Sequence, residues 1–189
     1  MRSTGSKSDR ETIVGRVDEA KSIKYAALTE DLGRLLGSET DPIAVLSNAV
    51  GLIHERMGFF WTGFYRVCRD SSGTPEMVLG PFQGPPACMR IAYGKGVCGT
   101  AWAKRKTQIV PDVEQFPGHI VCSSRSRSEI VVPLFDVGSG EVFAVLDIDS
   151  EQLATFDETD AFWLERICRF LAEKCKSLNP REKMLRFYK

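Results

Sequence analysis

The spacing of apolar residues changes twice along this 189-residue chain, and that change is the strongest constraint on its fold. From Val17 to Leu36 apolar residues recur every three or four positions, the period of an amphipathic helix, and Gly37 ends the run. A second run begins at Pro42, a residue that suits the first turn of a helix, and stops at Gly58. The spacing then shortens to two, and a helical run opens again near Asp157. The order expected is therefore two helices, a sheet and a final helix.

Five segments with alternating apolar residues lie between the helical runs and predict strands. They read FFWTGFYRV, PEMVLGPF, ACMRIAY, SEIVVPLF and EVFAVLDID, and the turn DVGSG joins the last two in a hairpin. Between the third and fourth, residues 97–105 predict a short helix and residues 107–110 a possible sixth strand, followed by a polar loop. The pattern predicts an α+β fold in which N- and C-terminal helices cover a central antiparallel sheet of about six strands.

Charge and hydropathy exclude several classes of partner. The 25 Lys and Arg residues balance 25 Asp and Glu residues, so no net charge favours nucleic acid or a lipid surface. No run approaches the ~18 to 20 apolar residues of a membrane span, and the N-terminus lacks the apolar core of a secretory signal. We therefore expect a cytoplasmic protein without nucleic-acid or membrane partners. Residues 1–15 are expected to form a flexible arm, 16–178 a single domain and 179–189 a tail.

Three of the six cysteines fit structural positions. In a reducing compartment cysteines serve more often as structural thiols, ligands or redox catalysts than as structural disulfides. Cys168 and Cys175 share the apolar stripe of the last helical run, which indicates the core. Cys68 ends the first predicted strand without a partner pattern and is interpreted as structural too.

The other three cysteines, Cys88, Cys98 and Cys122, lie in loops or where an element begins. Cys88 follows GPFQGPP, Cys122 lies within HIVCSSRSR, and Cys98 stands between glycines at a predicted helix start, a position that lowers the pKa of a thiol. No C-x-x-C pair accompanies them, which disfavours zinc. A hydrolytic dyad of Cys122 with His119 lacks an obvious third group. Three such thiols favour a redox nucleophile with resolving partners.

Three acidic residues gather at one end of the predicted hairpin. In AVLDIDS, Asp147 and Asp149 are two residues apart, so both side chains leave the same face of the strand, and Glu129 begins the strand EIVVPL. Crowded carboxylates raise the pKa of at least one member, which can then donate a proton near neutral pH, and such a cluster can also bind an ammonium group. The alternative is that these acids are simply exposed at a strand end.

The runs LGPFQGPPACMRIAYGKGVCGTAW, VPDVEQFPGHIVCSSRSRSEIVVPL and GEVFAVLDIDS, with the earlier WTGFY, resemble the free methionine-(R)-sulfoxide reductases, a GAF-domain family. The similarity covers roughly residues 25–175. It implies a GAF-like catalytic domain with active-site loops on the side of the sheet opposite the helices. It also implies that Cys122 is the nucleophile, Cys88 the principal resolving thiol and Cys98 a second possible participant.

The resemblance further implies a substrate site and a reaction. Glu129, Asp147 and Asp149 match the carboxylates of the substrate site and Trp61 an aromatic pocket wall, whereas Ser123 departs from the Asp that follows the nucleophile in bacterial members. The implied reaction reduces free L-methionine-(R)-S-oxide through a cysteine sulfenic acid and an intramolecular disulfide. A thioredoxin-type dithiol would recycle the enzyme, with no bound cofactor or metal, and a homodimer is expected.

Two functions of other classes remain open. A ligand-sensing GAF module without catalysis would keep the pocket but would not need three such thiols, and it usually adjoins an output domain. A thiol-based redox switch would use the cysteines but would not require the acidic cluster. Turnover of free methionine sulfoxide by the reduced protein distinguishes the enzyme from both.

Overall fold

The computed structural model describes residues 18–120 and 122–175, so the predicted arm and tail lie outside the described residues, and the domain limits at 16 and 178 stay predictions. In the described part the helices and strands follow the predicted order. They are α1 (Glu19–Leu36), α2 (Pro42–Met57), β1 (Trp61–Arg69), β2 (Pro75–Gln83), β3 (Arg90–Ala92), α3 (Gly96–Lys104), β4 (Gln108–Val110), β5 (Ser128–Phe135), β6 (Val142–Ser150) and α4 (Glu158–Lys174), with a 3-10 turn at Val113–Gln115. The structure confirms the predicted α+β class.

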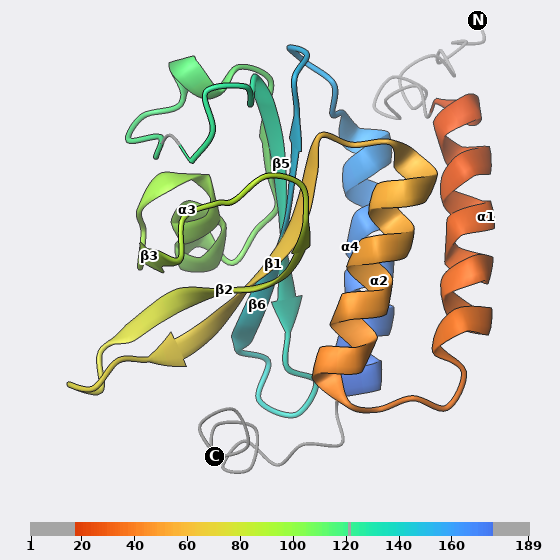
Figure 1. The fold of residues 1–189 in the computed structure, drawn as a ribbon, viewed down its shortest axis with the longest axis horizontal. Coiled ribbons are helices and arrows are strands. Elements are labelled where there is room, and N and C mark those ends of the chain that lie inside the picture. The colour runs from red at the N-terminus through yellow and green to blue at the C-terminus, as the bar shows by residue number, and fades with distance from the viewer. Residues whose placement is uncertain (1–17, 121, 176–189) are drawn as a thin grey trace, which may run out of the picture.

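One antiparallel sheet of six strands, in the order β3-β2-β1-β6-β5-β4, forms the centre of the molecule (Figure 1). Consecutive strands pair with one another, including the predicted β5–β6 hairpin, except β3 and β4, which lie at opposite edges of the sheet. The possible sixth strand is the edge strand β4. The pairing of β1 with β6 joins the two hairpin groups into one sheet. This long-range pair brings segments from both ends of the sequence to the middle of the sheet.

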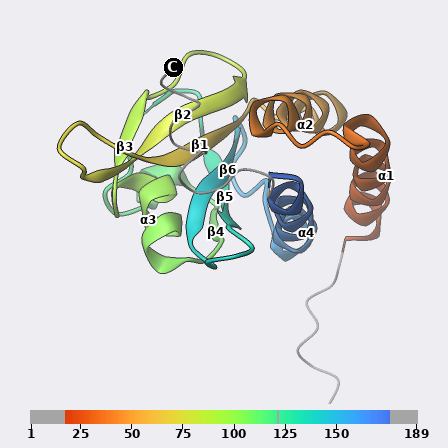
Figure 2. The ribbon, with the colours of Figure 1, turned by 90° about the horizontal axis from the view of Figure 1, so that it is seen from below.

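Helices cover the two faces of the sheet unequally. Seen from below, α2 and α4 lie against one face with α1 outside them, while the short α3 lies on the opposite face (Figure 2). Side-chain caps set where the helices begin: the Asp41 carboxylate accepts the N–H groups of Ile43 and Ala44, and Asp157 forms a capping box with Asp160. None of the helices in the described part has the length and apolar character needed to cross a membrane.

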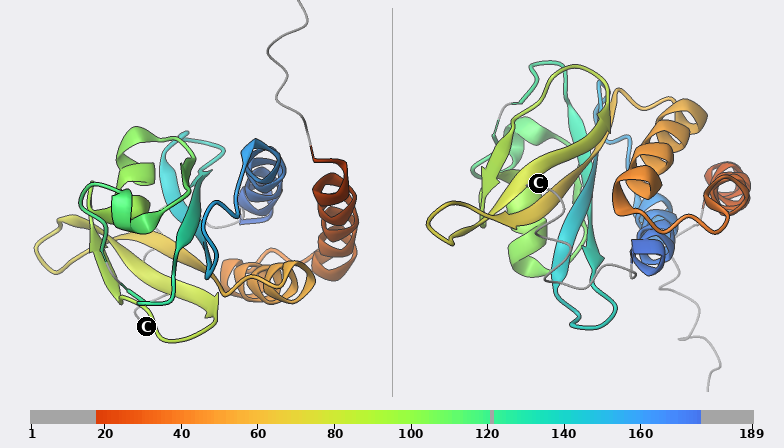
Figure 3. Two further views of the ribbon diagram at one scale, coloured as in Figure 1. Left: turned by 90° about the horizontal axis from the view of Figure 1, so that it is seen from above. Right: turned by 60° about the horizontal axis from the view of Figure 1, so that its bottom comes forward.

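Alternation along the central strands divides the buried residues into two layers. On β6, Leu146 and Ile148 are fully buried toward the helices, whereas Val145 belongs to the layer on the α3 face. The helix layer also contains Cys168 and Cys175, each 1% exposed, which confirms their predicted core positions. Two further views show the same division, with α1, α2 and α4 together on one side and α3 on the other (Figure 3).

Candidate active site

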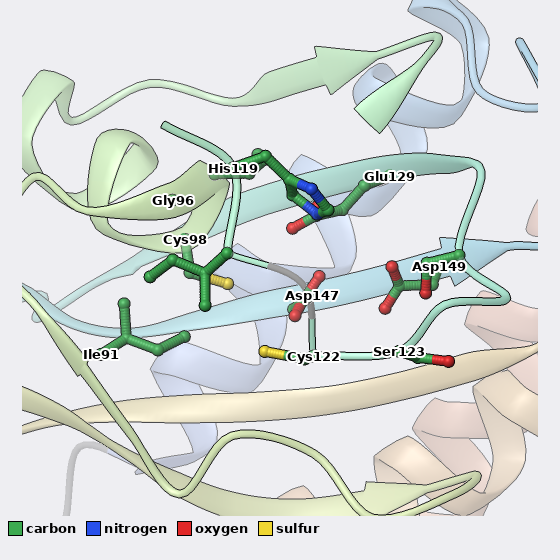
Figure 4. A pocket seen from close by; sticks show the side chains of 12 residues that line it. Ile91, Gly96, Cys98, His119, Cys122, Ser123, Glu129, Asp147 and Asp149 are labelled. Atoms are coloured by element: carbon green, nitrogen blue, oxygen red, sulfur yellow. The ribbon is translucent and has the colours of Figure 1, made fainter. Parts of the chain in front are cut away.

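The candidate site lies on the α3 face of the sheet, beneath the loop that joins β4 to β5 (Figure 4). The segment that contains Cys122 and Ser123 lines two small cavities there, of about 30 Å³ and 20 Å³. The larger one is lined by Ile91, Gly96, Val97, Cys98, His119, Ile120, Cys122, Ser123, Ser126, Glu129, Asp147 and Asp149. The smaller one adds Trp61, Tyr65, Pro86 and Ala87 from β1 and the loop after β2. All seven residues singled out in the sequence therefore lie in one region or directly beside it.

Strand register brings the acids and the tryptophan together. Asp149 is the register partner of Glu129 on β5 and of Trp61 on β1, so these three residues form one row across three strands. Asp147, two residues earlier on β6, leaves the same face as Asp149. The structure confirms that the three acids lie at the same end of the sheet.

Glu129 and Asp147 are buried and Asp149 is half-buried, so the three acids are not displayed at an exposed strand end. Glu129 and Asp147 are only 6% and 7% exposed, and Asp147 Oδ1 has no hydrogen-bond partner among the described residues. Burial, followed by the neighbouring Asp147 charge, raises the pKa of Glu129 well above its usual value, and burial with the Asp149 charge does the same for Asp147. Burial raises the pKa of Asp149 to about 6, partly offset by a hydrogen bond from Ser126. The cluster therefore retains protons near neutral pH.

Cys98 differs from its sequence-based interpretation. It lies in the first turn of α3 but is only 4% exposed, and burial together with the Asp147 and Glu129 charges raises the pKa of its thiol well above the usual value. The expectation that the helix N-terminus lowers this pKa is wrong, because desolvation and two nearby acids outweigh the helix dipole. The thiol donates toward Asp147. Cys98, Glu129 and Asp147 have donor atoms within 4.8 Å of one another, near enough to hold a cation, so the absence of a metal stays a prediction.

The other two of the three candidate site cysteines, Cys88 and Cys122, form a disulfide with Cα atoms 5.4 Å apart. It links the loop between β2 and β3 to the loop between β4 and β5, across 34 positions of sequence. Cys122 thus pairs with Cys88, the thiol to which the resemblance gives the resolving role. His119 only lines the cavity, half-buried, and burial lowers its pKa.

Aromatic side chains of β1 form the opposite wall. Trp61 is 3% exposed and stacks on Phe82 and Tyr65 at centroid distances of 5.6 and 6.1 Å. Gly63 leaves room for the indole, because a Cβ there would lie 2.2 Å from the ring. Sequence analysis missed Tyr65 and Ser126. The alternation signal that places Trp61 on this face also places Tyr65 there, four residues on, but nothing in the sequence marked Ser126.

Comparisons with known proteins give relatives that match most of the chain. A family model described as "GAF domain" matches residues 41–174. The free methionine-R-sulfoxide reductase of Escherichia coli is 43% identical over 76% of this chain and 83% of its own length. GAF domain-containing protein A of Dictyostelium discoideum is 49% identical over 80% of this chain and 92% of its own. A crystal structure of the Neisseria meningitidis free methionine-R-sulfoxide reductase, in complex with its substrate, is 48% identical with a TM-score of 0.77, covering 82% of this chain and 90% of that one.

A six-stranded sheet with helices on both faces and a small buried site beneath the α3-side loops defines a GAF domain, in agreement with the family match. Within that class the chain belongs to the free methionine-R-sulfoxide reductase family, an oxidoreductase family.

Proposed function

We propose that this protein reduces free methionine-(R)-sulfoxide to methionine with Cys122 as the nucleophile. The observation that carries the proposal is the disulfide of Cys122 with Cys88 directly beside three acids whose pKa values are raised by burial. A redox-active sulfur and a proton donor are the two groups that this reduction needs. The family relationship supports the same reaction.

The reaction uses each of these groups in turn. In the reduced protein the Cys122 thiolate attacks the sulfoxide sulfur while a protonated carboxyl, assigned to Glu129, protonates the sulfoxide oxygen. The hydroxyl then passes from the methionine sulfur to the Cys122 sulfur as the bond between the two sulfurs breaks, so methionine leaves with its electron pair and Cys122 becomes a sulfenic acid. The Cys88 thiol then displaces that oxygen as water and forms the disulfide, and an external thioredoxin-type dithiol reduces it by exchange. Sulfoxide and dithiol give sulfide, disulfide and water, with no bound cofactor.

The same site accounts for a free amino acid as substrate. The acids on β6 would hold the ammonium group, backbone N–H groups the carboxylate, and the Trp61 ring the methyl end. A residue within a peptide lacks both charged termini, so it would leave the buried acids without a partner. Substrate preference therefore follows from the charge of the site.

With the Cys88–Cys122 disulfide formed, the cavities of the site are too small for the substrate. Cavities of about 30 and 20 Å³ have room for about one water each, far less than an amino acid occupies. We expect reduction of Cys88–Cys122 to precede substrate binding, because displacement of the Cys122 segment, which lines both cavities, would join them. We expect oxidised protein to bind no methionine sulfoxide, in contrast to reduced protein.

An assay coupled to NADPH, thioredoxin and thioredoxin reductase tests the proposal. We expect turnover of free L-methionine-(R)-sulfoxide, little with the S diastereomer, and little with an N-acetylated, C-amidated substrate. Cys122→Ser should abolish turnover with any reductant, because a hydroxyl does not attack sulfur as a thiolate does. Ligand binding without turnover would favour the sensing module. Reversible disulfide formation without turnover would favour the redox switch.

A further inference from the structure

The loop that carries Cys88, residues 84–89, is attached to β1 by two aromatic side chains. The Trp61 Nε1–H donates to the carbonyl oxygen of Pro85 at 3.0 Å, and the Tyr65 hydroxyl donates to the carbonyl oxygen of Cys88 itself at 2.9 Å. Both donors are nearly inaccessible to water, at 3% and 1% exposed. The acceptor residues Pro85 and Cys88 are half-buried, and a partly buried hydrogen bond costs more to break than one at the surface, because its donor loses its partner away from water.

Tyr65 is itself held firmly. It lies in the middle of β1, with Leu79 of β2 and Val145 of β6 as its register partners, and its ring stacks on Trp61. At the far end of the loop, the Leu79 N–H donates to the Met89 carbonyl at 3.0 Å. The backbone on both sides of the Cys88 sulfur is therefore fixed to the centre of the sheet.

The segment that carries Cys122 has contacts of a different kind. Among the described residues, positions 122–125 make a local hydrogen bond, from the Arg125 N–H to Ser123 Oγ at 3.2 Å, and Arg125 contacts Glu151 through an exposed ion pair and the Phe60 ring through a cation–π contact at 4.6 Å. Within the described residues, therefore, the backbone around Cys88 has hydrogen bonds to the sheet, whereas the backbone of positions 122–125 has none to it.

We propose that Tyr65 is a positioning residue for disulfide formation: its hydroxyl fixes the Cys88 backbone and so holds the resolving thiol within reach of the Cys122 sulfur. This inference rests on the proposed function for the sulfenic acid step. In that step the Cys88 sulfur attacks the Cys122 sulfur, the S–S bond forms, the S–O bond breaks, and the oxygen leaves as water with the proton of Cys88 and its own. A fixed thiol raises the effective concentration at which the two sulfurs meet.

Rapid quench of Tyr65→Phe in a single turnover tests the proposal, because this substitution keeps the ring and removes only the donor. We expect Cys122 sulfenic acid, trapped by dimedone, to decay roughly fivefold more slowly, and the burst of one methionine per enzyme measures the preceding chemical step separately. Tyr25→Phe is the matched control. It removes another buried tyrosine hydroxyl, which donates to Asp160 at 2.9 Å on the helix side of the sheet, and should change neither rate.

A second measurement needs no methionine sulfoxide and so stays informative if the proposed function fails. Equilibration of each protein with glutathione redox buffers gives the stability of the Cys88–Cys122 disulfide. We expect Tyr65→Phe to lower the equilibrium constant for disulfide formation about fivefold relative to both wild type and Tyr25→Phe. An unchanged constant together with an unchanged sulfenic acid lifetime would overturn the proposal. So would a slower methionine burst with normal disulfide formation, since Tyr65 would then act on substrate.

Discussion

Both faces of the central sheet are buried under apolar residues, but at the end that holds the acids they differ in chemistry. Toward the helices, β5 and β6 present Ile130, Leu146 and Ile148, each 0% exposed and apolar. Toward α3, the same two strands present Glu129 and Asp147, which are 6% and 7% exposed. Burial on the helix face removes apolar surface from water and stabilises the fold. Burial on the α3 face withholds water from acids, which costs stability unless they remain protonated.

Because side chains alternate along a strand, neighbouring residues can belong to the stabilising core on one face and to the reactive site on the other. Leu146 and Asp147 are neighbours in sequence, yet one belongs to the packed core and the other to the site. Such a division predicts that substitutions on the two faces change different observables. The following experiments test whether the two faces differ in this way, and they are given in order of decreasing expected effect.

Glu129→Gln should have the largest effect. Loss of a general acid typically costs about 10² to 10⁴ in rate, so we expect kcat to fall at least about a hundredfold, with a smaller rise in KM. In the wild type kcat should decline as pH rises through the raised pKa of the donor, because the proton is lost, and this high-pH decline should be absent from the variant. If the decline persists in Glu129→Gln and disappears in an aspartate variant, that aspartate is the donor.

Leu146→Ala and Asp147→Asn form a pair on opposite faces. A cavity behind the fully buried Leu146 should lower the free energy of unfolding by about 3 kcal/mol while the folded protein keeps its kcat within about twofold. Asp147→Asn should leave the free energy of unfolding at pH 7.5 unchanged or higher and impair turnover. Urea unfolding beside the coupled assay measures both. Equal destabilisation by the two variants would show that Asp147 is part of the structural core.

Cys88→Ser and Cys98→Ser contrast two thiols on the α3 face. Cys88→Ser should release one methionine per enzyme but slow recycling by thioredoxin at least about tenfold, because the sulfenic acid lacks its partner. Cys98→Ser should recycle within about twofold of wild type, since a serine hydroxyl can still donate to Asp147. The opposite outcome would make Cys98 the resolving thiol despite its burial.

Asp149→Asn should produce the smallest effect, on stability against pH. The folded-state pKa of Asp149 is raised from 3.8 to about 6, so the folded protein binds this proton more tightly than the unfolded chain does. The stability that the proton confers is complete below about pH 4 and is lost as pH rises through about 6. The variant cannot titrate, so its free energy of unfolding relative to wild type should rise by roughly 2 kcal/mol between pH 4 and 7.5. Thermal unfolding of both proteins across this pH range measures the difference in stability. A difference that stays constant with pH would contradict the raised pKa of Asp149.

Periodicity predicted the elements of the fold closely, because local patterns record which side of each segment is buried. The α2 run from Pro42 to Gly58 and the last two strands lie within one or two residues of the expected limits. The pairing of β1 with β6, which sets Trp61 beside Asp149, was not predictable, because partners so far apart in the sequence leave no local signal. For the same reason the sequence could not show that acids would surround the Cys98 thiol and reverse its expected pKa shift.

The row of Trp61, Asp149 and Glu129 across three strands limits how the length of this chain can vary during evolution. Removal of one residue from β6 ahead of Asp147 would turn every later side chain to the opposite face, sending the acids into the helix layer and Ile148 into the site. Insertions into the exposed turns at residues 70–74 and 136–140 change no such parity. Descendants of this sequence are therefore free to lengthen at the hairpin tips, whereas the strands that carry the acids must keep the same number of residues.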